Sequence, residues 1–227
     1  MKDNFLFKPK NYSAKILDHK NIIPIGKIFC VGRNYPKHAE EMNETVEKDE
    51  PFFFSKPPQS LTQETIISYP NNPNNLHHEV ELVVIIGLEG KEIQAEESYK
   101  HILGYAVGID LTKRDLQKIA KVNSKPWDLS KGFDNSAPIS LVKLNQNNLI
   151  KEGKIELRLN GRIKQSGNIS EMIWPIDQLI SHLSNFITLY PGDIIFTGTP
   201  AGVGKVCKND KIEASIEGVG KLEVIFN

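Results

Sequence analysis

The distribution of apolar and polar residues predicts a chain built mainly from short strands. Residues 154–167 alternate with the strand period of two and contain Asn160-Gly161, the pair expected at the tight turn of a β-hairpin. Continuous apolar runs typical of buried strands occupy residues 25–35, where Gly32 ends the run, and residues 52–57, 82–87, 102–110, 192–200 and 220–226. Because strands outnumber helices, we expect an α+β fold with a mostly β core.

Helical patterns are fewer. Residues 36–44 suit a short helix with Pro36 in its first turn, and residues 112–122 suit a second helix with Thr112 as its N-cap. A third helix is expected within residues 171–187, starting or breaking near Pro175. Residues 1–25 show little periodicity and are interpreted as an N-terminal arm. No repeat or composition shift marks a linker, so we expect one domain over residues 26–227.

Composition argues against several classes of partner. The 227 residues are 39% hydrophobic and 25% charged, with 28 basic and 28 acidic side chains, so no net charge favours nucleic acid or an anionic membrane. No apolar run approaches the ~20 residues of a membrane span, and the N-terminus lacks the apolar stretch of a signal peptide. We therefore expect a cytoplasmic protein. Cys30 and Cys207 lack metal-type spacing and are interpreted as small buried hydrophobes in a reducing compartment.

Two glutamates interrupt an otherwise apolar, strand-like run. In LHHEVELVV, residues 76–84, Glu79 and Glu81 are two positions apart, so a strand directs both side chains to one face. Adjacent carboxylates beside an apolar sheet repel each other unless a cation lies between them. Asp110 ends another apolar run and completes an oxygen ligand set that suits Mg²⁺, Mn²⁺ or Ca²⁺ rather than structural zinc. A solvated strand face remains the alternative interpretation of the glutamate pair.

Histidines occur in the helix predicted over residues 36–44 and directly before the glutamate pair. His38 and Glu41 would share one face of the helix predicted over residues 36–44, where a carboxylate can orient a histidine for general-base catalysis. The same helix could equally present an ordinary solvated face. His77 and His78 are adjacent, without the spacing of a zinc helix, and are interpreted as structural.

Several further residues could bind an anionic substrate. Arg114 and Gln117 are one helical turn apart, and Arg33 and Arg114 could each bind a carboxylate bidentately or form an ordinary ion pair. Lys131 lies between aromatic residues, where it could stabilise an oxyanion or extend to water. The glycine-rich segment 197–205, TGTPAGVGK, lacks the Walker spacing, although its backbone amides could still approach a substrate carboxylate.

Six motifs in fixed order resemble the fumarylacetoacetate hydrolase family: CVGRNYPKHAEEM, PFFFSKP, LHHEVELVV, GYAVGIDLTKRDLQ, PWDLSKGFDNSAP and GDIIFTGTPAGVG. The resemblance runs from about Gly26 to the C-terminus and looks most similar to fumarylpyruvate hydrolases and acylpyruvases. It implies a β-roll fold, a catalytic domain over residues 26–227, and a homodimer. It also implies Mg²⁺ or Mn²⁺ held by Glu79, Glu81 and Asp110. One departure is AKVNSKPW, residues 120–127, which lacks the glycine expected before the proline.

The resemblance also implies roles for the other candidate residues. His38 and Glu41, on a lid helix, would activate water, and Lys131 would face an oxyanion. The substrate-binding positions that it implies are Arg33, Tyr35, Arg114, Gln117 and Thr199.

The reaction implied by the resemblance is metal-dependent hydrolysis of the C–C bond of an acylpyruvate, most directly fumarylpyruvate to fumarate and pyruvate. Oxaloacetate decarboxylation or tautomerisation, and isomerisation or decarboxylation of hydroxymuconate-type acids, are alternatives on the same 2-oxo acid site. A non-catalytic small-molecule binder is a third alternative.

Overall fold

Two β-sheets, in which most neighbouring strands are antiparallel, form the body of the protein. The computed structural model describes residues 6–8, 10–42, 50–71 and 75–227. A six-stranded sheet has the order β12 (Lys143–Leu144), β9 (Ile102–Ile109), β8 (Val80–Ile86), β15 (Ile194–Phe196), β3 (Ile28–Gly32) and β4 (Phe52–Lys56). A five-stranded sheet has the order β14 (Arg162–Asn168), β13 (Lys154–Leu159), β17 (Lys211–Ile216), β18 (Gly220–Phe226) and β6 (Ile66–Ile67).

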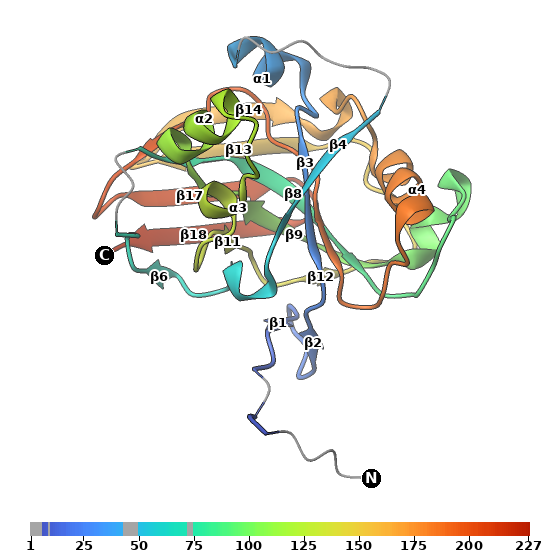
Figure 1. The fold of residues 1–227 in the computed structure, drawn as a ribbon. Helices are drawn as coiled ribbons and strands as arrows, with labels where there is room; N and C mark the ends of the chain where they lie inside the picture. Colours follow the sequence, from blue (N-terminus) through green and yellow to red (C-terminus); the bar gives the residue numbers. More distant parts are fainter. Residues whose placement is uncertain (1–5, 9, 43–49, 72–74) are drawn as a thin grey trace.

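Shorter strands and helices surround these sheets (Figure 1). The small sheets are β1 (Ser13–Lys15) with β2 (Ile22–Pro24), β11 (Ala137–Pro138) with β5 (Leu61–Thr62), and β7 (Leu76–His78) between β10 (Thr112–Lys113) and β16 (Gly204–Val206). The helices are α1 (Pro36–Glu41), α2 (Arg114–Val122), α3 (Asp128–Lys131) and α4 (Ile176–Phe186), with 3-10 turns η1 (Pro58–Ser60), η2 (Ala95–His101) and η3 (Ile169–Glu171). The expectation of an α+β fold with a mostly β core is confirmed.

Apolar packing covers both faces of the six-stranded sheet, because alternate residues of one strand join different clusters. On β8, Leu82 and Val84 pack with Leu157 and Val224 of the five-stranded sheet. The intervening Val83 and Ile85 of β8 belong to a second cluster on the opposite face. This double burial explains why the β8 segment reads as a continuous apolar run, so Glu81, the second residue of β8, is an exception that needs a chemical reason.

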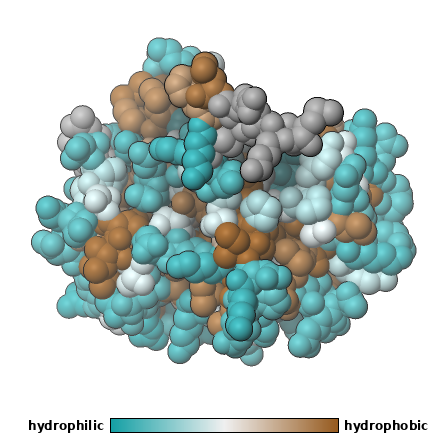
Figure 2. Space-filling view, turned by 90° about the horizontal axis from the view of Figure 1, so that it is seen from below, coloured by the Kyte–Doolittle hydropathy of each residue, from teal (hydrophilic) through white to brown (hydrophobic). Residues whose placement is uncertain are grey.

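The N-terminal segment contains one pair of strands. Ala14 of β1 and Ile23 of β2 pair with each other and are buried in the second apolar cluster. Figure 1 shows this pair at the lower end of the molecule, where the chain leaves the body. From that end, apolar side chains appear as separate patches among polar ones (Figure 2). None of the helices in the described residues has the length and apolar composition needed to cross a membrane.

Most element predictions are confirmed, whereas the N-cap predicted at Thr112 and the burial predicted for Cys207 are wrong. The hairpin turns at Asn160 and Gly161, both with positive φ, and α4 begins directly after Pro175. Thr112 does not cap α2, because it lies in β10 paired with β7 and its hydroxyl donates to the carbonyl of Asp110 at 3.2 Å. Cys207 is exposed, whereas Cys30 is buried as expected. The predicted helix over residues 36–44 ends at Glu41 as α1, and residues 43–44 lie outside the described residues.

Candidate functional site

Neighbouring strands bring the three acidic residues together. Glu81 is on β8, Glu79 lies just before this strand, and Asp110 directly follows β9. The antiparallel pairing of β8 with β9 is continued by a hydrogen bond from the Asp110 amide to the Glu79 carbonyl, at 2.8 Å. One carboxylate oxygen from each residue lies within 4.8 Å of the others, and exposed fractions are only 5%, 2% and 1% for Glu79, Glu81 and Asp110. The solvated-face alternative is therefore wrong.

The positive charges around the trio are unevenly distributed. The Lys131 Nζ lies 2.8 Å from Glu79 Oε2 and 2.6 Å from Asp110 Oδ2, and the Arg114 guanidinium pairs with the other oxygen of Glu79. Burial opposes the ionisation of Glu79, but Lys131 and then Arg114 outweigh it and hold the pKa of Glu79 well below its usual range. Burial also opposes the charge of Lys131, yet Asp110 and Glu79 raise its pKa.

Among the described residues, no cation pairs with Glu81 as Lys131 and Arg114 pair with Glu79. Its Oε2 accepts a hydrogen bond from the Gly198 amide at 2.7 Å. Burial, followed by the charges of Asp110 and Glu79, raises the pKa of Glu81 well above its usual range. The trio thus lacks positive charge at Glu81, and its donors are all carboxylate oxygens. Both properties fit a divalent hard cation such as Mg²⁺, Mn²⁺ or Ca²⁺.

Lys56 is a further buried cation beside Asp110, and the sequence did not indicate a role for it. It ends β4, is 2% exposed, and its Nζ lies 2.8 Å from Asp110 Oδ1. The same ammonium donates to the carbonyl and the hydroxyl of Ser136, both at 3.1 Å, to the Leu111 carbonyl at 3.3 Å, and to the Lys131 carbonyl. Lys56 therefore fixes Asp110 and the end of α3 to each other.

The helix α1 carries a histidine–glutamate pair, of which the histidine lines the same cleft. His38 Nδ1 lies 3.3 Å from Glu41 Oε2, and the His38 side chain lines the cleft with the three acids. Glu41 also accepts hydrogen bonds from the Gly202 amide, at 3.1 and 3.2 Å. Gly202 has φ +97°, and a Cβ there would lie 2.0 Å from the Lys164 carbonyl oxygen, so only glycine fits this turn. Figure 1 shows α1 at the top of the molecule, where β3 ends.

The remaining predicted residues divide between the cleft and a separate cavity. Arg114 donates to Gln117 Oε1 at 2.7 Å across one turn of α2, and both side chains line the cleft. Thr199 lines it too, with its Oγ1 accepting from Gln165 at 2.7 Å, as does Arg33. Tyr35 does not line this cleft.

Tyr35 is instead buried, 1% exposed, and lines a separate cavity of ≈ 240 Å³ beside Glu171 and Pro200. Its hydroxyl has no hydrogen-bond partner among the described residues. The structure therefore brings together the other substrate-binding candidates but separates Tyr35 from them. The sequence did not identify the remaining cleft-lining residues, which are Val31, Gly32, Met42, Phe54, Lys121 and Trp127.

The cleft is nearly filled by its own side chains. Its free volume is ≈ 30 Å³, enough for an ion or a water molecule but too small for an organic acid. Met42 and His38, from the α1 region, line it together with Lys131. A substrate could enter only if these side chains or α1 moved, which is the behaviour expected of a lid.

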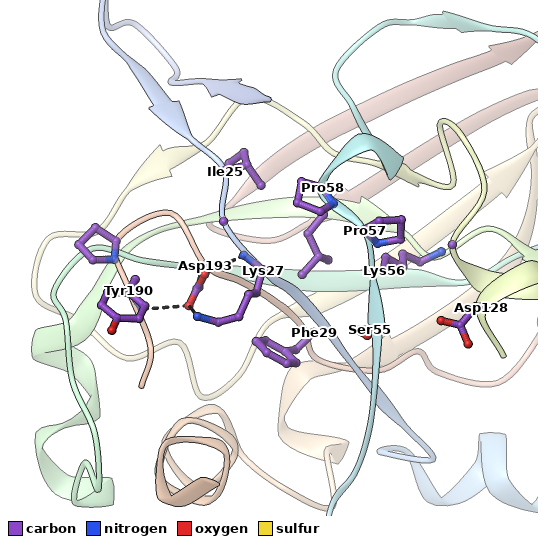
Figure 3. A pocket seen from close by; sticks show the side chains of 14 residues that line it. Ile25, Lys27, Phe29, Ser55, Lys56, Pro57, Pro58, Asp128, Tyr190 and Asp193 are labelled. Atoms are coloured by element: carbon purple, nitrogen blue, oxygen red, sulfur yellow. Dashed lines mark hydrogen bonds and ion pairs between the residues drawn. The ribbon is translucent and has the colours of Figure 1, made fainter. Parts of the chain in front are cut away.

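A wider groove of ≈ 660 Å³ lies elsewhere on β3 and β4 and has a different character (Figure 3). Its buried carboxylate, Asp193, is paired with the Lys27 ammonium at 2.8 Å and accepts the amides of Lys27 and Tyr190 at 2.7 and 2.9 Å. Both carboxylate oxygens of Asp193 are thus occupied by structural contacts to Lys27 and Tyr190. The cleft at the three acids, not this groove, is the candidate active site.

Known proteins resemble this chain over most of its length. The family model described as fumarylacetoacetate hydrolase, C-terminal, matches residues 27–226. A fumarylpyruvate hydrolase from Ralstonia is 38% identical over 186 residues, covering 81% of this chain and 97% of that protein. A mitochondrial oxaloacetate tautomerase from Mus musculus is 42% identical over 197 residues, covering 85% and 87%.

A solved structure extends the likeness to the whole chain. Fumarylpyruvate hydrolase from Pseudomonas aeruginosa, in complex with Mn²⁺ and pyruvate, superposes with a TM-score of 0.94 at 39% identity. The match covers 98% of this chain and 99% of that one.

Proposed function

The chain belongs to the fumarylacetoacetate hydrolase family, and from that premise we propose that it hydrolyses the C–C bond of an acylpyruvate, most directly fumarylpyruvate to fumarate and pyruvate. One observation carries the proposal: a histidine–glutamate pair, a buried trio of carboxylates and a lysine meet in one cleft. That combination supplies a base for water, ligands for a divalent metal and a cation for developing negative charge.

The metal ligands in this proposal are Glu79, Glu81 and Asp110. Their oxygen donors and the uncompensated charge at Glu81 support Mg²⁺ or Mn²⁺, with Ca²⁺ as an alternative. Bound there, the metal would act as a Lewis acid toward the oxygens of a 2-oxo carboxylate. The Mn²⁺ and pyruvate held by the Pseudomonas aeruginosa relative support this assignment.

Arg114 of α2 and Thr199 would bind and orient the substrate. The Arg114 guanidinium, fixed by Gln117 and Glu79, can donate two parallel hydrogen bonds to a carboxylate. The Thr199 hydroxyl, which lines the cleft and accepts a hydrogen bond from Gln165, can donate to another substrate oxygen. Both contacts would place the 2-oxo acid end of the substrate beside the three carboxylates.

The pair on α1 would activate water. With Nδ1 of His38 held by Glu41, Nε2 can take a proton from water as the water oxygen attacks the C4 carbonyl carbon of the substrate. Lys131 would face the oxyanion that forms. The C3–C4 bond then breaks, its electron pair goes to the pyruvate fragment, and the imidazolium can return the proton to C3 of that fragment. Such general-base assistance typically contributes roughly 10²–10⁴-fold.

Oxaloacetate decarboxylation or tautomerisation is the second candidate function. The 42% identity to the mouse oxaloacetate tautomerase supports it, because the same carboxylate trio could bind either 2-oxo acid. Neither reaction needs an attacking water, so the His38–Glu41 pair favours hydrolysis. Isomerisation or decarboxylation of hydroxymuconate-type acids and non-catalytic binding of a small molecule rank behind these two.

The metal assignment can be tested with Glu81→Ala. We expect the substitution to abolish both Mn²⁺ binding, measured by calorimetry, and turnover of fumarylpyruvate, measured by its ultraviolet absorbance. Chelator-treated wild-type protein should likewise be inactive and recover on adding Mg²⁺ or Mn²⁺. Full activity of the wild-type protein in metal-free buffer would remove the metal from the proposal.

The homodimer and the cytoplasmic location remain proposals from the family resemblance. Light scattering on the purified chain, which has a mass of 25.6 kDa, should give twice that value. A mass equal to a single chain at micromolar concentration would contradict the dimer.

A further inference from the structure

A buried glutamine lies one hydrogen bond away from the cleft. Gln165 is the one fully buried residue of β14, at 0% exposure, whereas the other positions of this strand are exposed or half-buried. An amide in such a place is costly unless its hydrogen bonds are made. Gln165 does not line the cleft, so any effect it has on a bound substrate must pass through a neighbouring side chain.

The side-chain amide of Gln165 uses its whole hydrogen-bonding capacity. Its Oε1 accepts from the Val80 amide at 3.1 Å and lies 2.9 Å from His78 Nδ1. Its Nε2 donates to Thr199 Oγ1 at 2.7 Å and to the Pro200 carbonyl at 2.8 Å. Both lone pairs of the oxygen and both hydrogens of the nitrogen are thereby occupied. The side chain ties the start of β8 to the loop that follows β15.

These partners fix which end of the amide is the oxygen and which is the nitrogen. The Val80 amide can only donate, and the Pro200 carbonyl can only accept. If the Gln165 amide were turned over, two donors would face each other at Val80 and two acceptors would face each other at Pro200. Gln165 therefore presents an N–H group to Thr199, and His78 donates to Gln165 from Nδ1.

The direction of the Thr199 hydroxyl follows from this arrangement. Because Oγ1 accepts from Gln165, the hydroxyl hydrogen of Thr199 points away from Gln165 and is available to another acceptor. No oxygen of the described residues accepts that hydrogen. Since Thr199 lines the cleft together with the three acids, an oxygen of a bound substrate can take the vacant place.

We propose that Gln165 is a positioning residue, which fixes the Thr199 hydroxyl as a hydrogen-bond donor to a carboxylate or keto oxygen of the substrate. The inference rests on the proposed function for the contact between Thr199 and the substrate. A threonine hydroxyl can either donate or accept, and an unrestrained one rotates between these orientations. Gln165 removes the accepting orientation before the substrate arrives, so less free energy is lost when an anionic oxygen binds.

The test has to separate this role from a merely structural one. The bonds of Gln165 to Val80 and Pro200 also hold the fold together, so a loss of stability on substitution would not by itself support the proposal. A double-mutant cycle measures the coupling between Gln165 and the Thr199 hydroxyl directly. Calorimetry at saturating Mn²⁺ would give the Kd of pyruvate for wild type, Gln165→Met, Thr199→Val and the double variant.

The cycle has a defined expected result. Thr199→Val replaces the hydroxyl by a methyl group and should raise the Kd about tenfold or more, because a hydrogen bond to a charged group is lost. Gln165→Met should raise the Kd about threefold or more in the wild-type background. In the Thr199→Val background it should raise the Kd less than about twofold, because the hydroxyl through which Gln165 acts is gone. Gln178→Met, the same substitution at an exposed position of α4, should behave as wild type.

Gln165→Glu keeps the proposal testable if Gln165→Met does not fold. Glutamate has nearly the shape of glutamine and retains an oxygen for the Val80 amide, but its carboxyl group carries at most one hydrogen where the amide carries two. It cannot donate to both Thr199 and Pro200, and in its ionised form it draws the Thr199 hydrogen towards itself. We expect the same rise in Kd of about threefold or more, again confined to proteins that retain the Thr199 hydroxyl.

The outcomes separate this inference from the proposed function. If pyruvate fails to bind the Mn²⁺-loaded wild type, or binds Thr199→Val as tightly as wild type, the corresponding part of the proposed function is wrong and the inference falls with it. If Thr199→Val weakens binding but the Gln165 variants leave the Kd unchanged, or raise it equally in both backgrounds, the positioning role of Gln165 alone is refuted.

Discussion

Replacing Lys56 by methionine should destabilise the protein strongly even without metal or substrate. The substitution removes an ammonium that lies 2.8 Å from Asp110 and is fully buried, while keeping a side chain of similar length. Asp110 would keep its contact with Lys131, at 2.6 Å, but lose the partner of its second oxygen. Removal of one member of a buried ion pair costs about 3–5 kcal/mol, because the other charge is left without its partner.

The hydrogen bonds of Lys56 to the backbone add less to this loss. The Ser136 carbonyl still accepts the Leu111 amide at 3.0 Å, and the Lys131 carbonyl still accepts the Ser136 hydroxyl at 2.8 Å. We therefore keep the estimate at about 3–5 kcal/mol for the whole substitution. With a urea m-value of about 3 kcal/mol/M, this corresponds to a fall of about 1–1.7 M in the unfolding midpoint.

Urea unfolding in chelator-treated buffer, followed by far-ultraviolet circular dichroism, measures this change directly. Lys27→Met is the matched control, since Lys27 also lies 2.8 Å from a buried aspartate, Asp193, but its side chain is 43% exposed. Asp193 also keeps two backbone amide donors, so we expect the control to lose about 1 kcal/mol or less. Equal midpoints for the two variants would refute the structural role given to Lys56.

Three further outcomes are expected. His38→Ala should leave Mn²⁺ affinity unchanged and lower kcat for hydrolysis by roughly 10²–10⁴-fold, and an unchanged kcat would remove His38 from the mechanism. Burial, and then the charge of Arg114, lower the pKa of His77 from 6.5 to about 4. Between these two pH values the unfolded state binds more protons than the folded state, so the stability of the protein should fall as the pH drops from 6.5 towards 4. His77→Gln should reduce this loss, measured as the urea midpoint at pH 5 against pH 7.5, and an equal loss in both proteins would contradict it. Gly202→Ala should lower the free energy of unfolding by about 1–3 kcal/mol, measured in urea, and should also lower kcat, because the left-handed turn that binds Glu41 cannot accept a Cβ. A variant that matches wild type in both stability and kcat would show that the turn adapts.

Local patterns in the sequence predicted the acidic centre well. The period of a strand places Glu79 and Glu81 on one side, and Asp110 stands at the end of an apolar run. Pairing of the two strands then brings the three carboxylates together. The hairpin at Asn160-Gly161 was equally readable, because positive φ at both positions demands such residues.

Features that depend on distant contacts were not readable. A lysine at the end of a strand is ordinarily solvated, and only the arrival of Asp110 and Ser136 from other segments makes Lys56 a buried partner. Thr112 has the chemistry of an N-cap, but pairing of β10 with β7 moves the N-cap by one residue, to Lys113. Tyr35 follows a cleft-lining segment, yet the turn into α1 directs it to another cavity.

The central claim is that a water-activating pair acts beside a metal-bound 2-oxo acid. It is tested most directly by incubating the purified protein and Mg²⁺ or Mn²⁺ with fumarylpyruvate, in parallel with acetylpyruvate and oxaloacetate, and identifying the products. We predict metal-dependent release of fumarate and pyruvate in equal amounts, abolished by a chelator. Survival of fumarylpyruvate while oxaloacetate is decarboxylated or tautomerised would contradict the hydrolase and leave the second candidate function in its place.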